Sequence, residues 1–149
     1  MTDAPIGIDP TPLNSRSAGV VLLYGDLVLL AQRCNLFEGM KVPFGGYWSP
    51  FAGAIESGES AAEAAARELW EEAGKKVSSE HLTYIGETRK GAFILYAYEL
   101  DNLFVPTLDY EHTEYGYFKI DTLHTSPSPT CPLVVKMVQD FHEGRRHSW

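Results

Sequence analysis

Three glutamates in the stretch "ARELWEEAG" (66–74) have a spacing that suits metal chemistry, because Glu68, Glu71 and Glu72 stand at i, i+3 and i+4. In an α-helix each residue turns the chain by about 100°, so these side chains share one face. Like charges at this spacing destabilise a helix by about 0.2–0.5 kcal/mol per pair. The face is therefore either well solvated or compensated by bound cations, and clustered carboxylates suit hard divalent cations such as Mg²⁺ or Mn²⁺.

The segment that carries the glutamates has the start and stop signals of a helix. Ser60 followed by Glu63 is a capping-box pattern, and Gly74 suits the position just past a helix end. An apolar stripe beside the glutamates predicts that one side of the helix packs against the rest of the protein. The residues of this stripe are Ala62, Ala65, Ala66, Leu69 and Ala73. The carboxylates would then stand at the edge of the packed surface.

The spacing around the helix indicates a family. From Gly53, the sequence "GAIESGESAAEAAARELWEEAGK" resembles the signature of the Nudix hydrolases, G-x5-E-x7-R-E-U-x-E-E-x-G-U, in which U is a bulky aliphatic residue. Every fixed glycine, glutamate and arginine of the signature is present. The flanking stretches "GGYW" and "EHTEYGYF" look like the family's usual surroundings, and the resemblance covers roughly residues 18–142.

Two positions depart from the family pattern. Lys75 stands where an aliphatic residue is usual, and "PFAG" (50–53) stands where Pro-Gly-Gly is usual. Neither departure removes a carboxylate. We expect Val77 or the preceding turn to fill the core in place of Lys75, whereas Phe51–Ala52 bears on the conformation of the loop and on the fit of the substrate.

The resemblance implies a metal site and a reaction. In the family, the glutamates of R-E-U-x-E-E hold divalent metals against a pyrophosphate. By that match Glu68, Glu71 and Glu72 are metal ligands, with the Gly53 carbonyl as a further ligand, for Mg²⁺ or Mn²⁺ as its substitute. Water then displaces one side of a phosphoanhydride in a nucleoside diphosphate linked to another group. Glu59 and Arg67 match motif positions that pair structurally and brace the loop against the helix.

The general base is either Glu68 or a glutamate outside the motif. The stretch "EHTEYGYF" (111–118) lies where many family members carry an additional acidic ligand or base. We favour Glu111 over Glu114 in this role. The predicted catalytic residues are therefore Glu68, Glu71 and Glu111.

Four further residues are candidates for substrate binding. Arg33 ends the second predicted strand, where relatives often contact a substrate phosphate, although a surface arginine explains it equally well. Aromatic side chains can stack on a nucleobase, yet near strands they more often belong to the core. The aromatic candidates are Tyr47, Trp48 and Tyr117.

The rest of the chain supplies the elements that must position the helix. Alternating or continuous apolar runs predict two strands joined at "YGD" within 19–33, a short strand near 47–52, two strands within 81–100 that turn near Lys90–Gly91, and a strand over 114–120. Residues 131–143 predict a C-terminal amphipathic helix. The intervening segment "CNLFEGMKVPFGGYW" (34–48) reads as a loop.

This order of elements predicts an α/β fold, a Nudix-type α/β/α sandwich with a mixed β-sheet between helices. We expect an irregular N-terminal arm over residues 1–17, a single domain over 18–142 and a C-terminal tail over 143–149.

Composition excludes some classes of function. The formal net charge of −8 argues against stable nucleic-acid binding, and an acidic protein that acts on a polyphosphate needs metal ions between the two anions. Cys34 and Cys131 do not make a disulfide framework, which favours a reducing compartment. The apolar runs are too short to span a membrane. We expect a cytoplasmic protein with a small nucleotide substrate, and a homodimer stays open.

The motif leaves open which group is attached to the diphosphate. ADP-ribose-type members often carry a proline about sixteen residues beyond the motif, and none occurs between Gly74 and Val105. The tyrosine typical of dinucleoside-polyphosphate hydrolases is not cleanly matched, because Tyr84 and Tyr96 fall on either side of its position. We therefore expect a nucleoside triphosphate pyrophosphohydrolase that releases NMP and pyrophosphate. The alternatives are an NDP-sugar or ADP-ribose-type pyrophosphatase and a non-catalytic nucleotide-binding regulator on the same fold.

Overall fold

The computed structural model describes residues 16–33, 36–37, 40–41, 48–88, 91–109, 112–125 and 132–146, and every structural statement below concerns these residues. Their strands are β1 (Ser17–Tyr24), β2 (Leu27–Arg33), β3 (Leu36–Phe37), β4 (Met40–Lys41), β5 (Trp48–Ser49), β6 (Phe51–Ala54), β7 (Thr83–Thr88), β8 (Phe93–Glu99) and β9 (His112–Lys119). Their helices are α1 (Ala61–Ala73), α2 (Pro132–Arg146) and the short 3-10 turns η2 (Ser79–His81) and η3 (Leu123–Thr125).

Strand β1 lies at the centre of a mixed sheet that has seven strands in the described part of the chain. It runs parallel to β8 from Ser17 to Leu23 and antiparallel to two strands on its other edge. There β2 pairs with the end of β1 and β6 pairs with its beginning, from Ser17 opposite Ala54 to Val20 opposite Phe51. Strand β9 extends the sheet along β2, and β7 extends it along β8. Strand β6 therefore leads directly from the sheet centre to the loop before α1.

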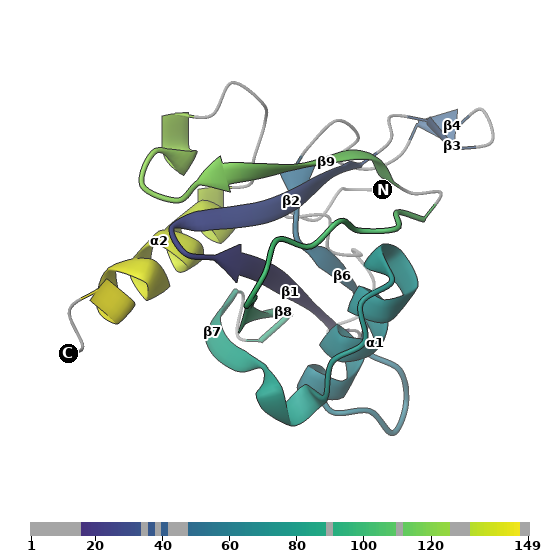
Figure 1. Cartoon of the computed structure of the whole chain (residues 1–149). Coiled ribbons are helices and arrows are strands. Elements are labelled where there is room, and N and C mark those ends of the chain that lie inside the picture. Colours follow the sequence, from purple (N-terminus) through teal and green to yellow (C-terminus); the bar gives the residue numbers. More distant parts are fainter. Residues whose placement is uncertain are drawn as a thin grey trace.

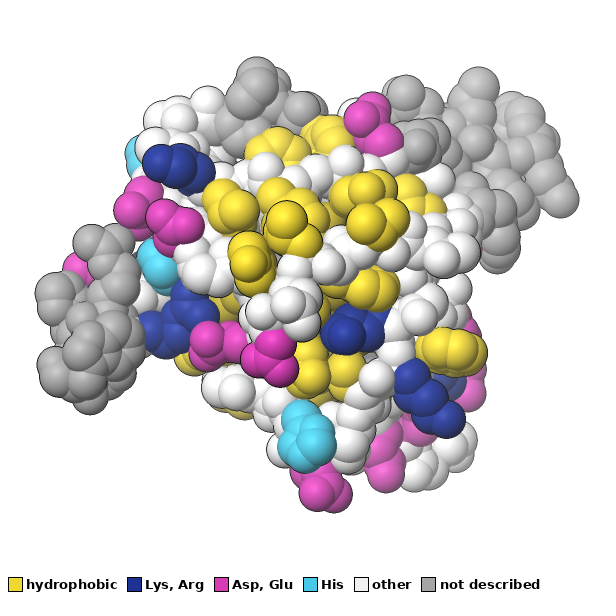
Figure 2. All heavy atoms as spheres, viewed as in Figure 1, with side chains coloured by type: hydrophobic (Ala, Val, Ile, Leu, Met, Phe, Trp, Pro, Cys, Tyr) yellow, Lys and Arg dark blue, Asp and Glu magenta, His cyan; other side chains and the backbone are white. Residues whose placement is uncertain are grey.

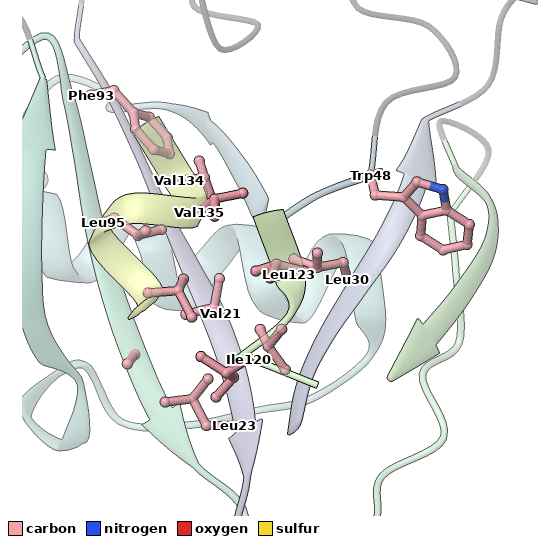
Figure 3. Packing of buried hydrophobic residues seen from close by; sticks show 13 residues of the cluster. Val21, Leu23, Leu30, Trp48, Phe93, Leu95, Ile120, Leu123, Val134 and Val135 are labelled. Atoms are coloured by element: carbon pink, nitrogen blue, oxygen red, sulfur yellow. The ribbon is translucent and has the colours of Figure 1, made fainter. Parts of the chain in front are cut away.

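Each face of the sheet is covered by one helix (Figure 1). Side chains of β1 alternate between the two faces, because successive residues of a strand point to opposite sides. Val21 and Leu23 pack with Val134 and Val138 of α2, and Figure 3 shows Val134 and Val135 of this helix beside Val21 and Leu95. The even-numbered residues of β1 pack on the other face with Ala64, Ala65, Leu69 and Ala73 of α1; they are Ala18, Val20 and Leu22.

Burial on both faces explains why β1 reads as a continuous apolar run rather than an alternating one. Its residues from Ala18 to Leu23 are all buried. The mixed sheet between two helices confirms the predicted α/β/α sandwich. The β1–β2 hairpin turns at "YGD" as expected, with Gly25 at φ 60°, a conformation that glycine adopts without steric cost.

Two segments differ from the elements that the sequence predicts. Part of the segment expected as a loop before Trp48 forms the two-residue strands β3 and β4, which pair with each other. Helix α2 continues past the expected tail boundary at 143 and ends at Arg146. Its last turn is held because Arg145 donates a hydrogen bond to the Gly25 carbonyl at 2.9 Å and forms an ion pair with Glu99 at 2.8 Å. These contacts to distant residues are not readable from the local sequence.

Candidate active site

Helix α1 begins and ends at the residues that the sequence indicates. The Ser60 hydroxyl accepts a hydrogen bond from the Glu63 amide at 3.1 Å, and the Glu63 carboxylate accepts one from the Ser60 amide at 2.9 Å. This capping box satisfies two of the amides that a helix start leaves unpaired. Gly74 closes the helix in the left-handed conformation at φ 77°. The helix that carries the glutamates is therefore fixed at both ends.

The packed face of α1 differs in detail from the predicted stripe. Ala65, Leu69 and Ala73 are buried as expected, but Ala62 and Ala66 are half-buried and Ala64 takes a place in the core instead. The buried face also contains Glu68 and Glu72, at 9% and 4% exposure. Charged residues are almost never this buried unless they are paired or bind a metal. These two carboxylates are therefore not part of a solvated helix face.

Glu71 has a different environment from its two neighbours in the motif. Its side chain is 53% exposed, and it lies 3.3 Å from the Arg67 guanidinium. Arg67 also pairs with Glu68 at 3.0 Å. The single arginine thus links the exposed carboxylate and one of the buried ones.

The predicted pair Glu59 and Arg67 lies within hydrogen-bond distance. Arg67 donates from Nε and Nη2 to the two carboxylate oxygens of Glu59, at 2.7 and 3.0 Å, and from Nη2 to the Ala54 carbonyl at 2.9 Å. A contact through two hydrogen bonds fixes the relative orientation of the two side chains and also pairs their opposite charges. The arginine holds the pKa of the Glu59 carboxyl below its ordinary value. It therefore joins the loop after β6 to α1.

Strand β6 contacts the buried glutamates directly. The Ala52 amide donates a hydrogen bond to Glu72 Oε1 at 2.9 Å. A methyl group on Gly53 would overlap the Glu68 carboxylate, so this position has to be glycine if Glu68 is to lie against the strand. The close approach explains physically why a glycine begins the motif.

The departure at Ala52 is compensated across the sheet. Gly19 of β1 pairs with Ala52 of β6, and a Cβ atom on Gly19 would lie 2.5 Å from the Ala52 Cβ. The glycine that "PFAG" lacks is thus supplied by the neighbouring strand. Phe51 is fully buried in the core on the α1 side.

The departure at Lys75 also has a packing explanation. The Lys75 ammonium lies 5.1 Å from the centre of the Phe104 ring and 5.6 Å from that of Tyr98. Cations are attracted to aromatic faces at such distances. Val77 packs against the core on the α1 side, as the sequence led us to expect.

Glu68, Glu71 and Glu72 line one cleft of about 420 Å³, whose walls come from β6 and the loop after it, α1 and the loop after β8. Its lining residues are Ala52, Gly53, Ala54, Glu56, Arg67, Glu68, Glu71, Glu72 and Asp109. Five of these carry carboxyl groups and one carries a guanidinium. On the face drawn in Figure 2, by contrast, acidic side chains are scattered among basic and apolar ones.

Burial raises the pKa of the Glu68 carboxyl, and the attraction of Arg67 offsets this only in part. Glu71, a like charge, adds to the increase. A positive ion in the cleft would act in the opposite direction, because it would stabilise the ionised carboxylates. The electrostatics of the site therefore favour cation binding.

The residues present fit a divalent cation. The Gly53 backbone leaves room for the Glu68 carboxylate, and carboxylate and carbonyl oxygens are the donors that Mg²⁺ and Mn²⁺ prefer. In the described part of the chain, no three histidine, cysteine, aspartate or glutamate side chains form a ready-made metal cage as they stand. Glu68, Glu71 and Glu72, with the Gly53 carbonyl, are the groups that would hold the ion if it bound here.

Sequence reasoning missed two carboxylates of the cleft: Glu56, in the loop after β6, and Asp109. Asp109 belongs to the loop between β8 and β9, and its backbone amide donates to the Glu72 carbonyl at 3.2 Å. Figure 1 shows this loop passing over the sheet on the side of α1. The signal in the sequence is weak, because an aspartate in this loop has no spacing relation to the motif.

Two of the aromatic candidates for substrate stacking, Trp48 and Tyr117, do not line the cleft. Trp48 is 7% exposed and packs edge-on against Phe118, with ring centres 5.0 Å apart, in the core on the α2 side. The Tyr117 hydroxyl donates to the Phe104 carbonyl at 2.6 Å and accepts from the Phe104 amide at 2.9 Å. Trp48 has no open face for a base, and Tyr117 anchors the loop after β8.

The remaining candidate base and substrate-binding residues are described by the structure only in part. Glu114 is exposed on β9, opposite Gln32, and does not line the cleft. The backbone of Arg33 pairs with His112 at the end of β2. The side chain of Arg33 and the whole of Tyr47 and Glu111 lie outside the described residues.

Comparison with known proteins identifies the family. The profile described as NUDIX domain matches residues 13–141, and the chain therefore belongs to the Nudix hydrolase family. Nudix hydrolases as a family act on pyrophosphate-containing substrates and generally use divalent metals. No helix in the described part of the chain is long and apolar enough to cross a membrane.

Solved structures share the fold at low sequence identity. A Nudix hydrolase from Nitrosomonas europaea has a TM-score of 0.64 at 22% identity, over 90% of this chain and 73% of that one. An Ap4A hydrolase from C. elegans, solved as a binary complex, has a TM-score of 0.63 at 19% identity, over 88% and 98%. A MutT protein from Methanosarcina mazei has a TM-score of 0.63 at 18% identity, over 89% and 94%.

A curated protein matches half of the chain. An octanoyltransferase from Myxococcus xanthus is 40% identical over 77 residues, which make up 50% of this chain and 20% of that protein. The chain thus spans about a fifth of the length of this relative.

Proposed function

We propose that this chain is a divalent-metal-dependent hydrolase of a phosphoanhydride in nucleoside-diphosphate-linked substrates. Within that class we propose a nucleoside triphosphate pyrophosphohydrolase that releases NMP and pyrophosphate. The observation that supports this most is the burial of Glu68 against Gly53 and of Glu72 against the Ala52 amide, in a cleft lined by carboxylates. A bound divalent cation would neutralise charge on the phosphoanhydride and make water a better nucleophile.

The side chains of the site have separate roles in this proposal. Glu68, Glu71 and Glu72, with the Gly53 carbonyl, hold the metal. Arg67 fixes the loop after β6 through Glu59, so the two walls of the cleft keep their separation. The reaction breaks one bond between phosphorus and the bridging oxygen and forms one to the oxygen of water, whose proton must be accepted.

The proton acceptor is Glu68 or Glu111 in this proposal, with Glu114 as a third candidate. Its place in the wall of the cleft supports Glu68, because a proton acceptor must lie within hydrogen-bond reach of the attacking water. Glu111 is proposed as an alternative proton acceptor on the basis of the family resemblance. On the same basis, Arg33 and Tyr47 are proposed to contact the substrate.

A substrate panel with Mg²⁺ tests the reaction and its substrate class. Nucleoside triphosphates are incubated with wild type and then with inorganic pyrophosphatase, and orthophosphate is measured. We expect orthophosphate only after pyrophosphatase is added. NDP-sugars, ADP-ribose and Ap4A are incubated in parallel and treated with alkaline phosphatase, which releases the terminal phosphates that hydrolysis exposes on their products. If phosphate is released only in this second set, the substrate is an NDP-sugar, ADP-ribose or a dinucleoside polyphosphate rather than a nucleoside triphosphate.

The alternative from another class is a non-catalytic nucleotide-binding regulator. Every motif carboxylate is present, which favours an enzyme. No turnover of any substrate, together with a rise in melting temperature on adding nucleotide, would support the regulator.

The proposal also includes a cytoplasmic location and a small nucleotide as the partner, without stable nucleic-acid binding. A homodimer stays open, and size-exclusion chromatography with light scattering decides it.

A further inference from the structure

The loop between β8 and β9 is fastened to the end of α1 beside the cleft. The amides of Thr107 and Asp109 donate hydrogen bonds to the carbonyls of Ala73 and Glu72, at 2.8 and 3.2 Å. The last carbonyls of a helix have no partner within the helix, so these bonds satisfy groups that would otherwise be unpaired. They place the Asp109 side chain in the cleft wall near Glu72.

His112, the first residue of β9, lies behind Asp109. Its Nδ1 is 2.8 Å from Asp109 Oδ1, and its backbone amide donates to the Asp109 carbonyl at 3.3 Å. An ionised carboxylate only accepts hydrogen bonds, so the imidazole is the donor in this contact. The two residues thus close a small turn at the edge of the site.

The imidazole of His112 is buried and packs against an aromatic ring. The His112 side chain is 0% exposed, and its ring meets Phe51 edge-on with ring centres 5.8 Å apart. The Nε2 atom is buried and has no hydrogen-bond partner among the described residues. A buried polar atom without a partner destabilises the fold. An apolar side chain of similar size would pack against Phe51 without that cost, so the imidazole's distinct contribution is its bond to Asp109.

Phe51 connects this contact to the motif. It immediately precedes Ala52, whose amide binds Glu72, while the amide of Asp109 binds the Glu72 carbonyl. His112 therefore lies between the two segments that hold Glu72 from either side. A carboxylate has two oxygens and about four lone pairs, so Asp109 can accept from His112 and still serve the cleft.

We propose that His112 is a positioning residue which, through Asp109, fixes a carboxylate outside the motif at the metal-binding cleft. The proposal rests on the proposed function, since it assumes that the cleft binds a divalent cation and a phosphoanhydride. Asp109 would contact the ion or its water shell, and the hydrogen bond from His112 would set its orientation. Residues that orient a metal's surroundings in this way typically change metal affinity or activity by about 10- to 100-fold when they are replaced.

A double-mutant cycle tests whether His112 acts through Asp109. The single variants are Asp109→Asn, which keeps the shape but removes the charge, and His112→Leu, which keeps apolar volume but removes the donor. Binding of Mn²⁺ to the metal-free protein is measured by calorimetry, and kcat and KM are measured on the substrate that the panel selects. We expect each single variant to weaken Mn²⁺ binding about 10-fold. The double variant should bind no more weakly than Asp109→Asn, because coupled residues are not additive.

Conservative and control variants separate positioning from packing. His112→Asn keeps an amide donor near the place of Nδ1 and should retain most of the Mn²⁺ affinity. His81→Leu and Asp101→Asn change exposed residues of the same types and should leave Mn²⁺ binding unchanged. If His112→Leu does not fold, Asp109→Asn and His112→Asn still decide the question.

The inference is overturned if His112→Leu lowers the melting temperature but leaves Mn²⁺ affinity, kcat and KM unchanged, because His112 is then only a core residue. It is also overturned if the two single losses add in the double variant. A wild-type protein that neither binds Mn²⁺ nor hydrolyses any substrate of the panel overturns the proposed function and this inference together. An active wild type with normal Mn²⁺ binding by Asp109→Asn overturns this inference alone.

Discussion

Glu72 is 4% exposed, and its carboxylate accepts a hydrogen bond from the Ala52 amide at 2.9 Å. In Glu72→Gln the amide oxygen can keep this bond while one anionic ligand is lost. We expect the metal-free protein to melt at the same temperature or slightly higher, because repulsion from Glu68 is relieved. By contrast, kcat should fall by about 100-fold or more, since a catalytic metal contributes several kcal/mol and about 1.4 kcal/mol is a factor of ten. The increase in melting temperature with Mg²⁺ should shrink; Glu80→Gln, an exposed change, is the control. Near-normal kcat with an unchanged metal response would contradict the assignment of Glu72.

Also at the residue scale, the contact between Glu59 and Arg67 predicts a dependence of stability on pH. Arg67 lowers the pKa of the Glu59 carboxyl below 4.5, so the stabilisation is present above about pH 4.5 and is lost as pH falls through the lower folded pKa. We expect Glu59→Gln to lower the free energy of unfolding by about 1 kcal/mol at pH 7. The melting temperature should fall by about 2–4 °C, and the difference from wild type should vanish in acid. Thermal melts at several pH values measure this, with Glu56→Gln as the control, because Glu56 is mostly exposed and 3.7 Å from Arg67. A difference that persists unchanged at low pH would show that charge is not the cause.

At the scale of elements, strands β1 and β6 approach each other closely at Gly19 and Ala52. A methyl group on Gly19 would lie 2.5 Å from the Ala52 Cβ and 2.9 Å from the Phe51 carbonyl oxygen. We expect Gly19→Ala to destabilise the protein by about 1–3 kcal/mol, because overpacking forces the strands apart. Adding Ala52→Gly should restore part of the lost stability, because it removes the clash with the Ala52 Cβ. The rescue should be incomplete, because the close contact with the Phe51 carbonyl oxygen remains. Denaturant melts of both variants and of Ala52→Gly alone check this. No rescue by the second change would mean that the strands do not meet as described.

At the scale of the whole molecule, two helices and the sheet between them bring the carboxylates of the cleft together only in the folded state. A ligand that binds the native state stabilises it by about 2.7 kcal/mol at 100 times its Kd. We expect saturating Mg²⁺ or Mn²⁺ to raise the melting temperature by roughly 5–10 °C, given about 2–4 °C per kcal/mol for a chain of this size. Excess EDTA should reverse the shift and abolish activity. NaCl at equal ionic strength is the control for screening. Full turnover in EDTA, or an equal shift with NaCl, would refute the metal site.

The sequence by itself determined the helix, its limits and the family. A capping box, a closing glycine and carboxylates one turn apart depend on contacts within a few residues, so their spacing is enough to predict them. It also predicted the alternation of strands and helices that makes the mixed sheet. The tertiary structure alone decided that Glu68 and Glu72 are buried while Glu71 is exposed, that Trp48 and Tyr117 pack rather than face the cleft, and that Asp109 joins it. These outcomes depend on the register between strands far apart in the chain and on how one loop docks on the end of α1, and no local spacing encodes such contacts.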